Sequence, residues 1–593
     1  MRVADYVFKL LADKGVEHAF LVVGGGAMQL NDALRLETRI KPVCCHHEQA
    51  CAIAAEGYFR ASGKLPVVSV TTGPGGTNAI TGLIGAWLDS IPMVVISGQV
   101  KHETTIESCR ELGLRQLGDQ EINIVDIVKP VTKYAKMVVD PNSIRAELET
   151  AVHEATTGRP GPVWLDIPLN VQGAVIDESE LSTPPTFKDM VPSCSREDVG
   201  QCVELLARSR RPVVIAGHGV KLANAADAFF SFIDKVQVPV VTTFNGFDLI
   251  PSGHPLYFGR IGTIGQRRAN FVLQNADLVI SIGSRNNIRQ ISYNWENFAK
   301  NAKKIVVDID PAELRKPTVK PDLAIHSDAG RFLHQLIGAV AGSRFCHDLW
   351  TEWCKGIRAK YNPRTEDRQV CEGGVNPYQM AALISDHCPA HASVAIGNGT
   401  VSIAAFQTWK VKAGQSVFCN SGCASMGYDL PASIGAAVAT GRLTVCLAGD
   451  GSLMMNLQEL VTVAYQRLPV KIFLFDNGGY TSIRQTQGNL FGKDFIGCDQ
   501  SSGVGFPDFA SLAGILGFRV SEIRSHADME AVLNKVFATE DPEFILVKIP
   551  PSFGFAPKLS ARRLPNGKME SPSLEDMYPF LSREEMSENV CRI

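Results

Sequence analysis

The chain has 593 residues, of which 45% are hydrophobic and 20% are charged, a globular composition long enough for about three domains. Its formal net charge of −3 gives no general attraction for nucleic acid or anionic membranes, so neither is expected as a partner. No apolar run reaches the roughly 18 residues that span a membrane, and the start MRVADYVFKLLADKGV is an amphipathic pattern, not a secretory signal. Fifteen cysteines without framework spacing indicate reduced thiols and a cytoplasmic protein.

Residues 1–170 alternate between strand and helix patterns. Strands are expected at HAFLVV, KPVCCHH, PVVSVTT and PMVVISG, and the first three lead into glycine-rich turns or helical segments. Such alternation is typical of an α/β domain with a parallel sheet.

Two further α/β regions follow, at 192–345 and 375–557. In the second region the expected strands are RPVVIAGHG, VPVVTTFNG, ADLVISIGSRNN and KKIVVDIDP, each ending in glycine or polar residues. The tail, 558–593, is charged and contains proline, so we expect it to pack over a surface and not to form a domain.

One β-α-β unit in the third region carries the clearest chemical signal. LTVCLAG (443–449) and LPVKIFLF (468–475) are typical of buried parallel strands, and SLMMNLQELVTVAYQR (452–467) between them predicts a helix. The apolar face of that helix is expected to hold Leu453, Leu457, Leu460, Val461 and Ala464.

Asp450 and Asn477 follow these two strands, so both are expected at the sheet edge where open α/β sheets bind ligands. The flanking glycines allow close backbone approach, and the helix start offers free N–H groups to an anion. A carboxylate, an amide oxygen and a carbonyl from the Gly-Gly segment suit a Mg²⁺ ion that also holds phosphate oxygens. The alternative is a turn acid and a turn amide without a ligand.

With these pieces the chain resembles the thiamine-diphosphate-dependent enzymes, in particular the acetolactate synthase branch. GDG followed by a strand ending in DN matches the family's diphosphate and Mg²⁺ motif, with Asp476 replacing the first of two asparagines. HHEQACAIAAEGYFRASG, TTGPGGTNAITGLIGAWLDSIPMVVISGQV, GDQEINIV and SMGYDLPASIGAAVA are similar to other family segments, in the same order. The resemblance covers nearly the whole chain and implies an α/β fold of three consecutive doubly wound domains with mostly parallel sheets.

The resemblance implies thiamine diphosphate and Mg²⁺ as cofactors, with Asp450, Asn477 and the carbonyl of Gly479 holding the metal. The residues that would contact thiamine diphosphate are Gly449, Asp450, Gly451, Ser452, Met426, Asn477 and Gly479. Glu48 would hydrogen-bond the aminopyrimidine ring and help to remove the thiazolium proton, and Gln120 would be a second catalytic residue. From the residues alone, Glu48 also suits a surface acid at a helix start, and Met426 suits a core position.

The second region resembles the flavin-binding domain of acetolactate synthases. The positions that contact FAD there correspond to Gly217, Gly219, Arg285, Asp308 and Asp328. An acid after a strand is also what a Rossmann domain uses for an adenosine ribose. The family's Arg-Phe-Asp-Asp-Arg becomes RNNIR (285–289), with both acids lost, so a domain that keeps the fold without the nucleotide is the alternative. A bound FAD would be structural.

For activity, the resemblance implies decarboxylation of a 2-keto acid, with pyruvate expected, and transfer of the acyl unit to a carbonyl acceptor. Thr486 stands where the family has a tryptophan, and the Gly-Tyr-Thr-Ser-Ile-Arg run resembles members associated with polysaccharide and modified-sugar pathways. A wider acceptor pocket follows, with Arg484 available to an anionic acceptor. The runner-up is a 2-keto acid decarboxylase that does not ligate. A non-catalytic relative is disfavoured by intact Glu48, Asp450 and Asn477.

The resemblance also implies the assembly. In this family the counterpart of Glu48 in one subunit meets the counterpart of Asp450 in another, so a homodimer or homotetramer with active sites at the subunit interface is expected.

Overall fold

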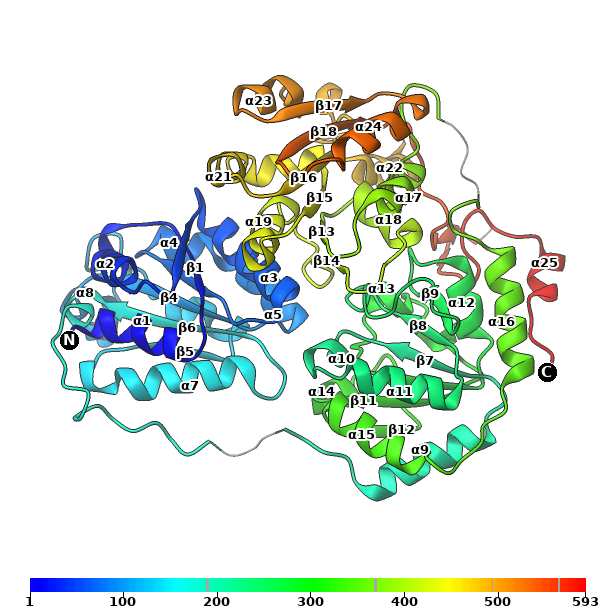
Figure 1. Ribbon diagram of the computed structural model, residues 1–593, viewed down its shortest axis with the longest axis horizontal. Helices are drawn as coiled ribbons and strands as arrows, with labels where there is room; N and C mark the ends of the chain where they lie inside the picture. The colour runs from blue at the N-terminus through cyan, green and yellow to red at the C-terminus, as the bar shows by residue number, and fades with distance from the viewer. Residues whose placement is uncertain (188–190, 367–370, 493, 564–565) are drawn as a thin grey trace.

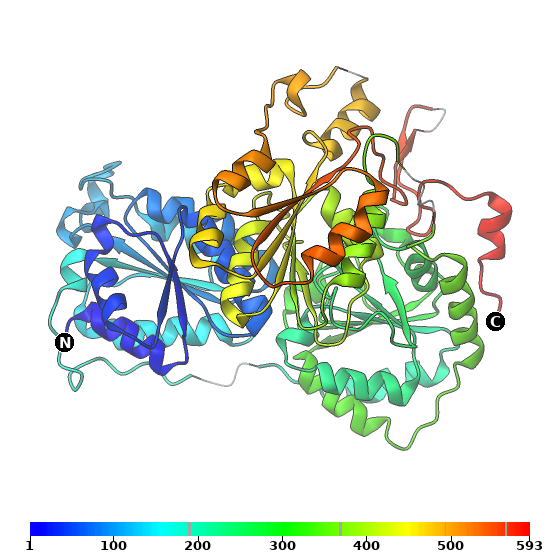
Figure 2. The same cartoon turned by 45° about the horizontal axis from the view of Figure 1, so that its top comes forward.

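The computed structural model describes residues 1–187, 191–366, 371–492, 494–563 and 566–593. Three α/β units lie side by side, each built on a six-stranded parallel sheet (Figure 1). The chain runs from the first unit along a long connection into the second, and then into the third, which packs against both (Figure 2). The predicted fold class, consecutive doubly wound α/β units with parallel sheets, is confirmed.

The first sheet has the strand order β2-β1-β3-β4-β6-β5. Its strands are β1 (His18–Leu21), β2 (Lys41–Cys44), β3 (Val67–Val70), β4 (Met93–Gln99), β5 (Tyr134–Met137) and β6 (Pro162–Pro168). The helices are α1 (Val3–Asp13), α2 (Met28–Leu36), α3 (Glu48–Ser62), α4 (Pro74–Asn78), α5 (Ile80–Asp89), α6 (Ile124–Val128), α7 (Ile144–Thr156) and α8 (Leu169–Gln172). Both faces are covered because side chains alternate along each strand: Phe20 packs in the cluster of α3, whereas Ala19 and Leu21 pack in that of α1.

The second sheet has the order β12-β11-β10-β7-β8-β9. Its strands are β7 (Pro212–Ala216), β8 (Val240–Thr242), β9 (Tyr257–Arg260), β10 (Leu278–Ile282), β11 (Lys303–Asp308) and β12 (Leu323–His326). The helices are α9 (Arg196–Arg208), α10 (Gly219–Leu222), α11 (Ala226–Val236), α12 (Arg267–Gln274), α13 (Ile288–Ile291), α14 (Pro311–Arg315), α15 (Ala329–Ala339) and α16 (Asp348–Lys360). The four strands predicted here are β7, β8, β10 and β11.

The third sheet has the order β14-β13-β15-β16-β18-β17. Its strands are β13 (Ser393–Ile396), β14 (Ser416–Cys419), β15 (Thr444–Gly449), β16 (Val470–Asp476), β17 (Arg519–Ile523) and β18 (Glu543–Lys548). The helices are α17 (Pro377–His387), α18 (Thr400–Thr408), α19 (Asp429–Thr440), α20 (Asp450–Leu453), α21 (Glu459–Gln466), α22 (Thr481–Phe491), α23 (Phe509–Ile515) and α24 (Met529–Val536).

The tail packs over the second unit. It contains β19 (Arg562–Arg563), β20 (Met569–Glu570) and α25 (Arg583–Glu588). Leu574 and Cys591 are buried in one cluster with Phe271 of α12 and Trp350 of α16.

The helix predicted over 452–467 is wrong as a single element. Helix α20 begins at Asp450, a 3₁₀ turn (Met454–Asn456) follows, and α21 starts only at Glu459. The Asn456 amide donates a hydrogen bond of 2.7 Å to the carbonyl of Gly427, so a tertiary contact fixes this turn. The buried face is shifted as a result: Val461 is 39% exposed, whereas Val463 is buried.

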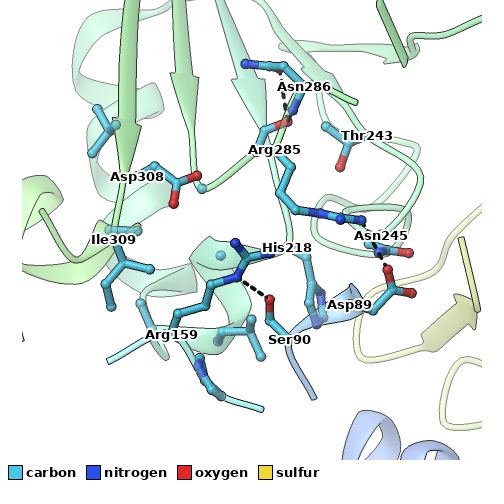
Figure 3. Close-up of a pocket in the computed structure, with 18 of the residues that line it drawn as sticks. Asp89, Ser90, Arg159, His218, Thr243, Asn245, Arg285, Asn286, Asp308 and Ile309 are labelled. Atoms are coloured by element: carbon cyan, nitrogen blue, oxygen red, sulfur yellow. Dashed lines mark hydrogen bonds and ion pairs between the residues drawn. The ribbon is translucent and has the colours of Figure 1, made fainter. Parts of the chain in front are cut away.

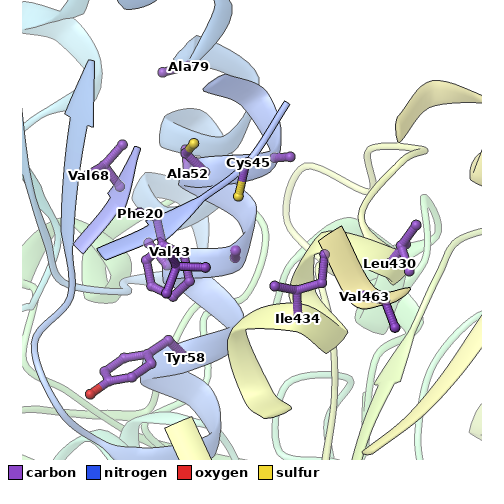
Figure 4. Close-up of a cluster of buried hydrophobic side chains, with 14 of the residues drawn as sticks. Phe20, Val43, Cys45, Ala52, Tyr58, Val68, Ala79, Leu430, Ile434 and Val463 are labelled. Carbon is purple, nitrogen blue, oxygen red and sulfur yellow. The ribbon is translucent and has the colours of Figure 1, made fainter. Parts of the chain in front are cut away.

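The first and third units share a hydrophobic core through α3 and α19 (Figure 4). Tyr58 on α3 and Ile434 on α19 belong to the same buried cluster. The two helices approach closely at Gly57, where a Cβ atom would lie 2.2 Å from the carbonyl oxygen of Ala432. Only glycine fits this crossing without moving a backbone.

Two further features concern the cysteines and the length of the apolar helices. All fifteen cysteines are free thiols. Within the described ranges, no helix has both the length and the apolar character needed to cross a membrane.

Candidate active site and nucleotide pocket

The first candidate site lies at the carboxyl edge of the third sheet, where the chain order reverses between β13 and β15. Asp450 follows β15, Asn477 follows β16, and Thr400 begins α18 after β13. Strands β15 and β16 pair in parallel with Gly449 opposite Phe475, so Asp450 and Asn477 lie at the same edge, as predicted. Such a reversal point is where open α/β sheets bind ligands.

The Asp450 carboxylate is held against the backbone of the Asp-Asn-Gly-Gly segment. It accepts hydrogen bonds from the N–H groups of Gly451 (2.7 Å), Asn477 (3.1 Å) and Gly479 (2.9 Å). Gly479 has φ +137°, and a Cβ atom there would lie 2.0 Å from the carbonyl oxygen of Cys498. The glycine is therefore needed both for its conformation and for the close approach.

Two oxygen atoms at this edge suit a cation. Asp450 is 2% exposed, and burial raises the pKa of its carboxyl to about 6, against the opposing effect of the backbone N–H groups. The Asn477 amide nitrogen donates to Thr400 Oγ1 at 3.0 Å, but its Oδ1 is buried with no hydrogen-bond partner among the described residues. Buried polar atoms are nearly always satisfied, so this oxygen beside a carboxylate fits a Mg²⁺ ligand set.

All of the residues predicted to contact thiamine diphosphate line one pocket at this edge. They are Met426, Gly449, Asp450, Gly451, Ser452, Asn477 and Gly479. Met426 is 38% exposed, so it is not a core residue, and the neighbouring Gly427 N–H donates to Ser452 Oγ at 2.9 Å. The turn that carries Met426 is thereby fixed to α20.

The sequence reasoning missed part of this pocket. Asn398, Gly399, Thr400 and Tyr480 also line it. The signal was present, since the apolar strand SVAI (393–396) ends in Gly-Asn-Gly-Thr, the same polar and glycine-rich ending that identified Asp450.

Glu48 and Gln120, the two predicted catalytic residues, lie in the first unit and outside the Asp450 pocket. Glu48 begins α3, is buried, and accepts a hydrogen bond of 3.0 Å from the Asn78 amide. Gln120 is exposed with φ +60°, and its carbonyl packs against Gly73. No described residue before Ile264 lines the Asp450 pocket, so a single chain does not bring Glu48 and Gln120 into it.

The two departures from the family pattern near this site form ion pairs. Asp476 pairs with Lys548 at 2.8 Å across β16 and β18, and its negative charge contributes to the raised pKa of the Asp450 carboxyl. Arg484, expected to be available to an anionic acceptor, pairs with Asp499 at 3.0 Å. Its positive charge is therefore already balanced.

A second pocket lies at the carboxyl edge of the second sheet, between β7 and β10, where the chain order also reverses (Figure 3). Of the residues predicted to contact FAD, Gly219, Arg285, Asp308 and Asp328 line it. Gly217 lies just behind them, where a Cβ atom would come within 2.1 Å of the Gly283 carbonyl oxygen. The structure thus brings these five positions together.

Residues from the other two units complete this pocket and were not predicted. Asp89, Ser90 and Arg159 come from the first unit, and Ser421 comes from the third. Arg159 donates to Ser90 Oγ at 2.9 Å, and Arg285 lies 3.4 Å from Asp89. Local patterns in the sequence do not reveal such contacts between distant segments.

Two titratable groups in this pocket suit a polar ligand. Burial raises the pKa of the Asp308 carboxyl to about 6. The His218 ring faces the pocket, and both of its nitrogens are buried without a partner among the described residues (Figure 3). Burial and the charges of Arg60 and Lys221 lower the pKa of His218 well below its ordinary value. A neutral imidazole offers one donor and one acceptor, which fits the hydroxyl and ring groups of a nucleotide.

Three protein-family models match the chain along its length. They describe the thiamine pyrophosphate enzyme N-terminal TPP binding domain at residues 1–125, the central domain at 199–336 and the C-terminal TPP binding domain at 397–548.

Among curated proteins, the chain is 32% identical over 552 residues to the acetolactate synthase isozyme 1 large subunit of Escherichia coli (strain K12), covering 92% of this chain and 93% of that protein. It is 31% identical over 567 residues to the acetolactate synthase large subunit of Lactococcus lactis subsp. lactis (strain IL1403), with 94% of each covered. It is 30% identical over 563 residues to acetolactate synthase 1, chloroplastic, of Zea mays, covering 92% of this chain and 85% of that protein.

Proposed function

The chain belongs to the thiamine pyrophosphate enzyme family, and we propose that it decarboxylates pyruvate and transfers the remaining two-carbon unit to a carbonyl acceptor. The observation that carries this proposal is the pocket of Asp450 and Asn477, a buried carboxylate beside an unpartnered amide oxygen. The similarity to acetolactate synthase large subunits supports a carboligase. We further propose that it acts in the cytoplasm, which its free thiols support.

In this proposal Asp450, Asn477 and the carbonyl of Gly479 hold Mg²⁺, which neutralises the diphosphate of the cofactor. Ser452 and the N–H groups at the start of α20 face the same pocket. Thiamine diphosphate, when bound, supplies the electron sink that lets a 2-keto acid lose CO₂. Met426 supports the cofactor from the side of the fixed turn described above.

Glu48 is the proposed proton-transfer group, acting through its Oε atoms on the aminopyrimidine ring. The Asn78 amide holds this carboxyl in position at 3.0 Å, and its burial excludes water. Since one chain leaves Glu48 outside the Asp450 pocket, we propose that a second copy supplies it. The active unit is then a homodimer, or a homotetramer built from such dimers, with Gln120 facing the same shared site.

We also propose that the pocket at β7 and β10 holds FAD in a structural role. The close backbone approach at Gly217 and Gly283, the arginines and the acid at the end of β11 are the features of a dinucleotide crevice. His218 supports the proposal because a buried imidazole without partners lacks only a polar ligand.

Mass spectrometry of products tests the proposal. Purified protein with thiamine diphosphate, Mg²⁺ and pyruvate is offered aldehydes, 2-keto acids and keto sugars in turn. A carboligase gives a new product whose mass equals the acceptor plus the two-carbon unit. Release of acetaldehyde with every acceptor would instead identify the non-ligating decarboxylase.

A further inference from the structure

A basic groove lies between the second and third units, away from both pockets described above. We define it by β9, α12 and α16 on one side and by α17, the end of α18 and residues 409–412 on the other. Seven Lys and Arg side chains line it, and none of its described lining residues is Asp or Glu. The groove shares no lining residue with the Asp450 pocket.

Three arginines form the inner wall of this basic groove without an acidic partner. They are Arg260 at the end of β9, Arg268 in α12 and Arg358 in α16. Among the described residues, no carboxylate lies within ion-pair distance of any of the three. Burial and the like charges of its two neighbours lower the pKa of Arg268 to about 10, so it still carries its proton at neutral pH.

Their hydrogen bonds leave donors free. Arg260 is 1% exposed and donates to the carbonyls of Phe406 (2.9 Å) and Trp409 (2.8 Å), but its Nε is buried with no partner in the described chain. Among the described residues, Arg268 donates one side-chain hydrogen bond, from Nε to Gln266 Oε1 at 3.3 Å. Both guanidinium groups therefore have donors to offer a ligand in the groove.

Two other buried arginines of this chain are each paired with a carboxylate. Arg267, next to Arg268, is 2% exposed and lies 2.6 Å from Glu366. Arg60 lies 2.8 Å from both Glu56 and Asp89. A buried charge is normally paired because desolvation is costly. Arg260 is as buried as Arg60 and Arg267, but it has no acidic partner among the described residues.

The other four cations of the groove do not balance the charge of the inner arginines. Lys412 donates to the backbone carbonyls of Asp386 and Cys388. Arg364 and Lys410 share Asp386 at 2.5 and 3.7 Å, and Lys355 pairs with Glu352 at 3.2 Å. These acids serve the outer cations and leave the inner arginines unbalanced.

We propose that the basic groove is a binding site for a small phosphate-bearing anion, a diphosphate or larger, distinct from the cofactor diphosphate. Guanidinium groups bind phosphate oxygens through paired N–H donors, and phosphate groups carry enough charge to balance several arginines. A monocarboxylate would leave most of the positive charge unbalanced. The depth of Arg260 favours a small ligand over a protein segment.

Titration calorimetry with inorganic pyrophosphate tests this site in the holoenzyme. The protein is first saturated with thiamine diphosphate and Mg²⁺, so that the Asp450 pocket cannot bind pyrophosphate. Free Mg²⁺ is then removed. We expect saturable binding that weakens with added salt. Arg268→Gln should weaken it by about tenfold or more, because a charge-assisted hydrogen bond is lost. Lys14→Gln, which removes the same charge from an exposed residue of the first unit, should change nothing.

Three results would overturn the proposal. The first is no saturable binding of pyrophosphate to the wild-type holoenzyme. The second is a Kd for pyrophosphate that is unchanged in Arg268→Gln. If Arg268→Gln fails to retain thiamine diphosphate, Arg358→Gln is measured in its place. The third is binding of citrate as tight as that of pyrophosphate, which would refute the phosphate class.

Discussion

Asp450→Asn should stabilise the metal-free protein while abolishing cofactor binding. Burial raises the pKa of this carboxyl from 3.8 to about 6, so the folded chain resists its ionisation. About two pKa units correspond to about 3 kcal/mol, the upper limit of what the ionised carboxylate costs the folded state without a cation. Asparagine keeps the shape and carries no charge to desolvate, and its single oxygen can still accept from the N–H groups of Asn477 and Gly479. Its amide nitrogen cannot accept from the N–H of Gly451, so the gain should fall below this limit.

The pH dependence of this effect has a definite sign. Below about pH 4 the carboxyl is protonated in the folded and unfolded chains alike, so it makes no difference to stability. Between about pH 4 and 6 the unfolded chain loses its proton first, so the stability of the wild type falls as pH rises. The gain from Asp450→Asn should therefore be absent near pH 4 and complete above about pH 7.

Thermal unfolding with excess chelator measures this gain as a difference in Tm between the two proteins across the pH range. Adding Mg²⁺ and thiamine diphosphate should reverse the order, because only the wild type is stabilised by binding. An Asp450→Asn protein that is no more stable than the wild type at pH 8 in chelator would refute the reasoning. So would equal stabilisation of both proteins by the cofactors.

Three further predictions concern the remaining parts of the site. Glu48→Gln should still bind the cofactor, but the C2 proton of the cofactor should exchange with deuterated water about 10²–10⁴-fold more slowly, as measured by NMR of quenched samples. Exchange at the wild-type rate would make Glu48 a structural acid. Coexpressed Glu48→Gln and Asp450→Asn chains should regain up to about a quarter of wild-type activity, since mixed dimers contain one intact shared site; no recovery would contradict a site between subunits. The purified protein should be yellow, and Arg285→Ala should lose most of the flavin; a colourless protein that takes up no added FAD would contradict the FAD assignment.

The strand ends were the parts of the site that the sequence could predict. Asp450 and Asn477 follow apolar runs that form β15 and β16, and a parallel pair brings both to one edge. Thr400 follows β13 in the same way and was missed, although it accepts the hydrogen bond of Asn477. The expectation failed where a tertiary contact overrode the local period, as when Asn456 bonded to Gly427 and divided the predicted helix.

Contacts between distant segments could not be predicted from local patterns. Arg159 and Ser421 reach the proposed FAD pocket from the first and third units, and each lies more than fifty residues from any strand of the second sheet. His218 lies within the predicted glycine segment, but only the surrounding fold shows that its two nitrogens lack partners. The inner arginines of the basic groove become unusual only when their neighbours are known.

The most direct test of the account is ¹³C NMR of the reaction of [2-¹³C]pyruvate with the protein, thiamine diphosphate and Mg²⁺. Transfer of one labelled two-carbon unit to a second pyruvate joins two labelled carbons, so the product should show one-bond ¹³C–¹³C coupling. This coupling should disappear when Asp450→Asn replaces the wild type. When an unlabelled acceptor that outcompetes pyruvate is added to the wild type, the coupled product should be replaced by a singly labelled adduct. Label found only in acetaldehyde, whatever the acceptor, would contradict carboligation as the function of this chain.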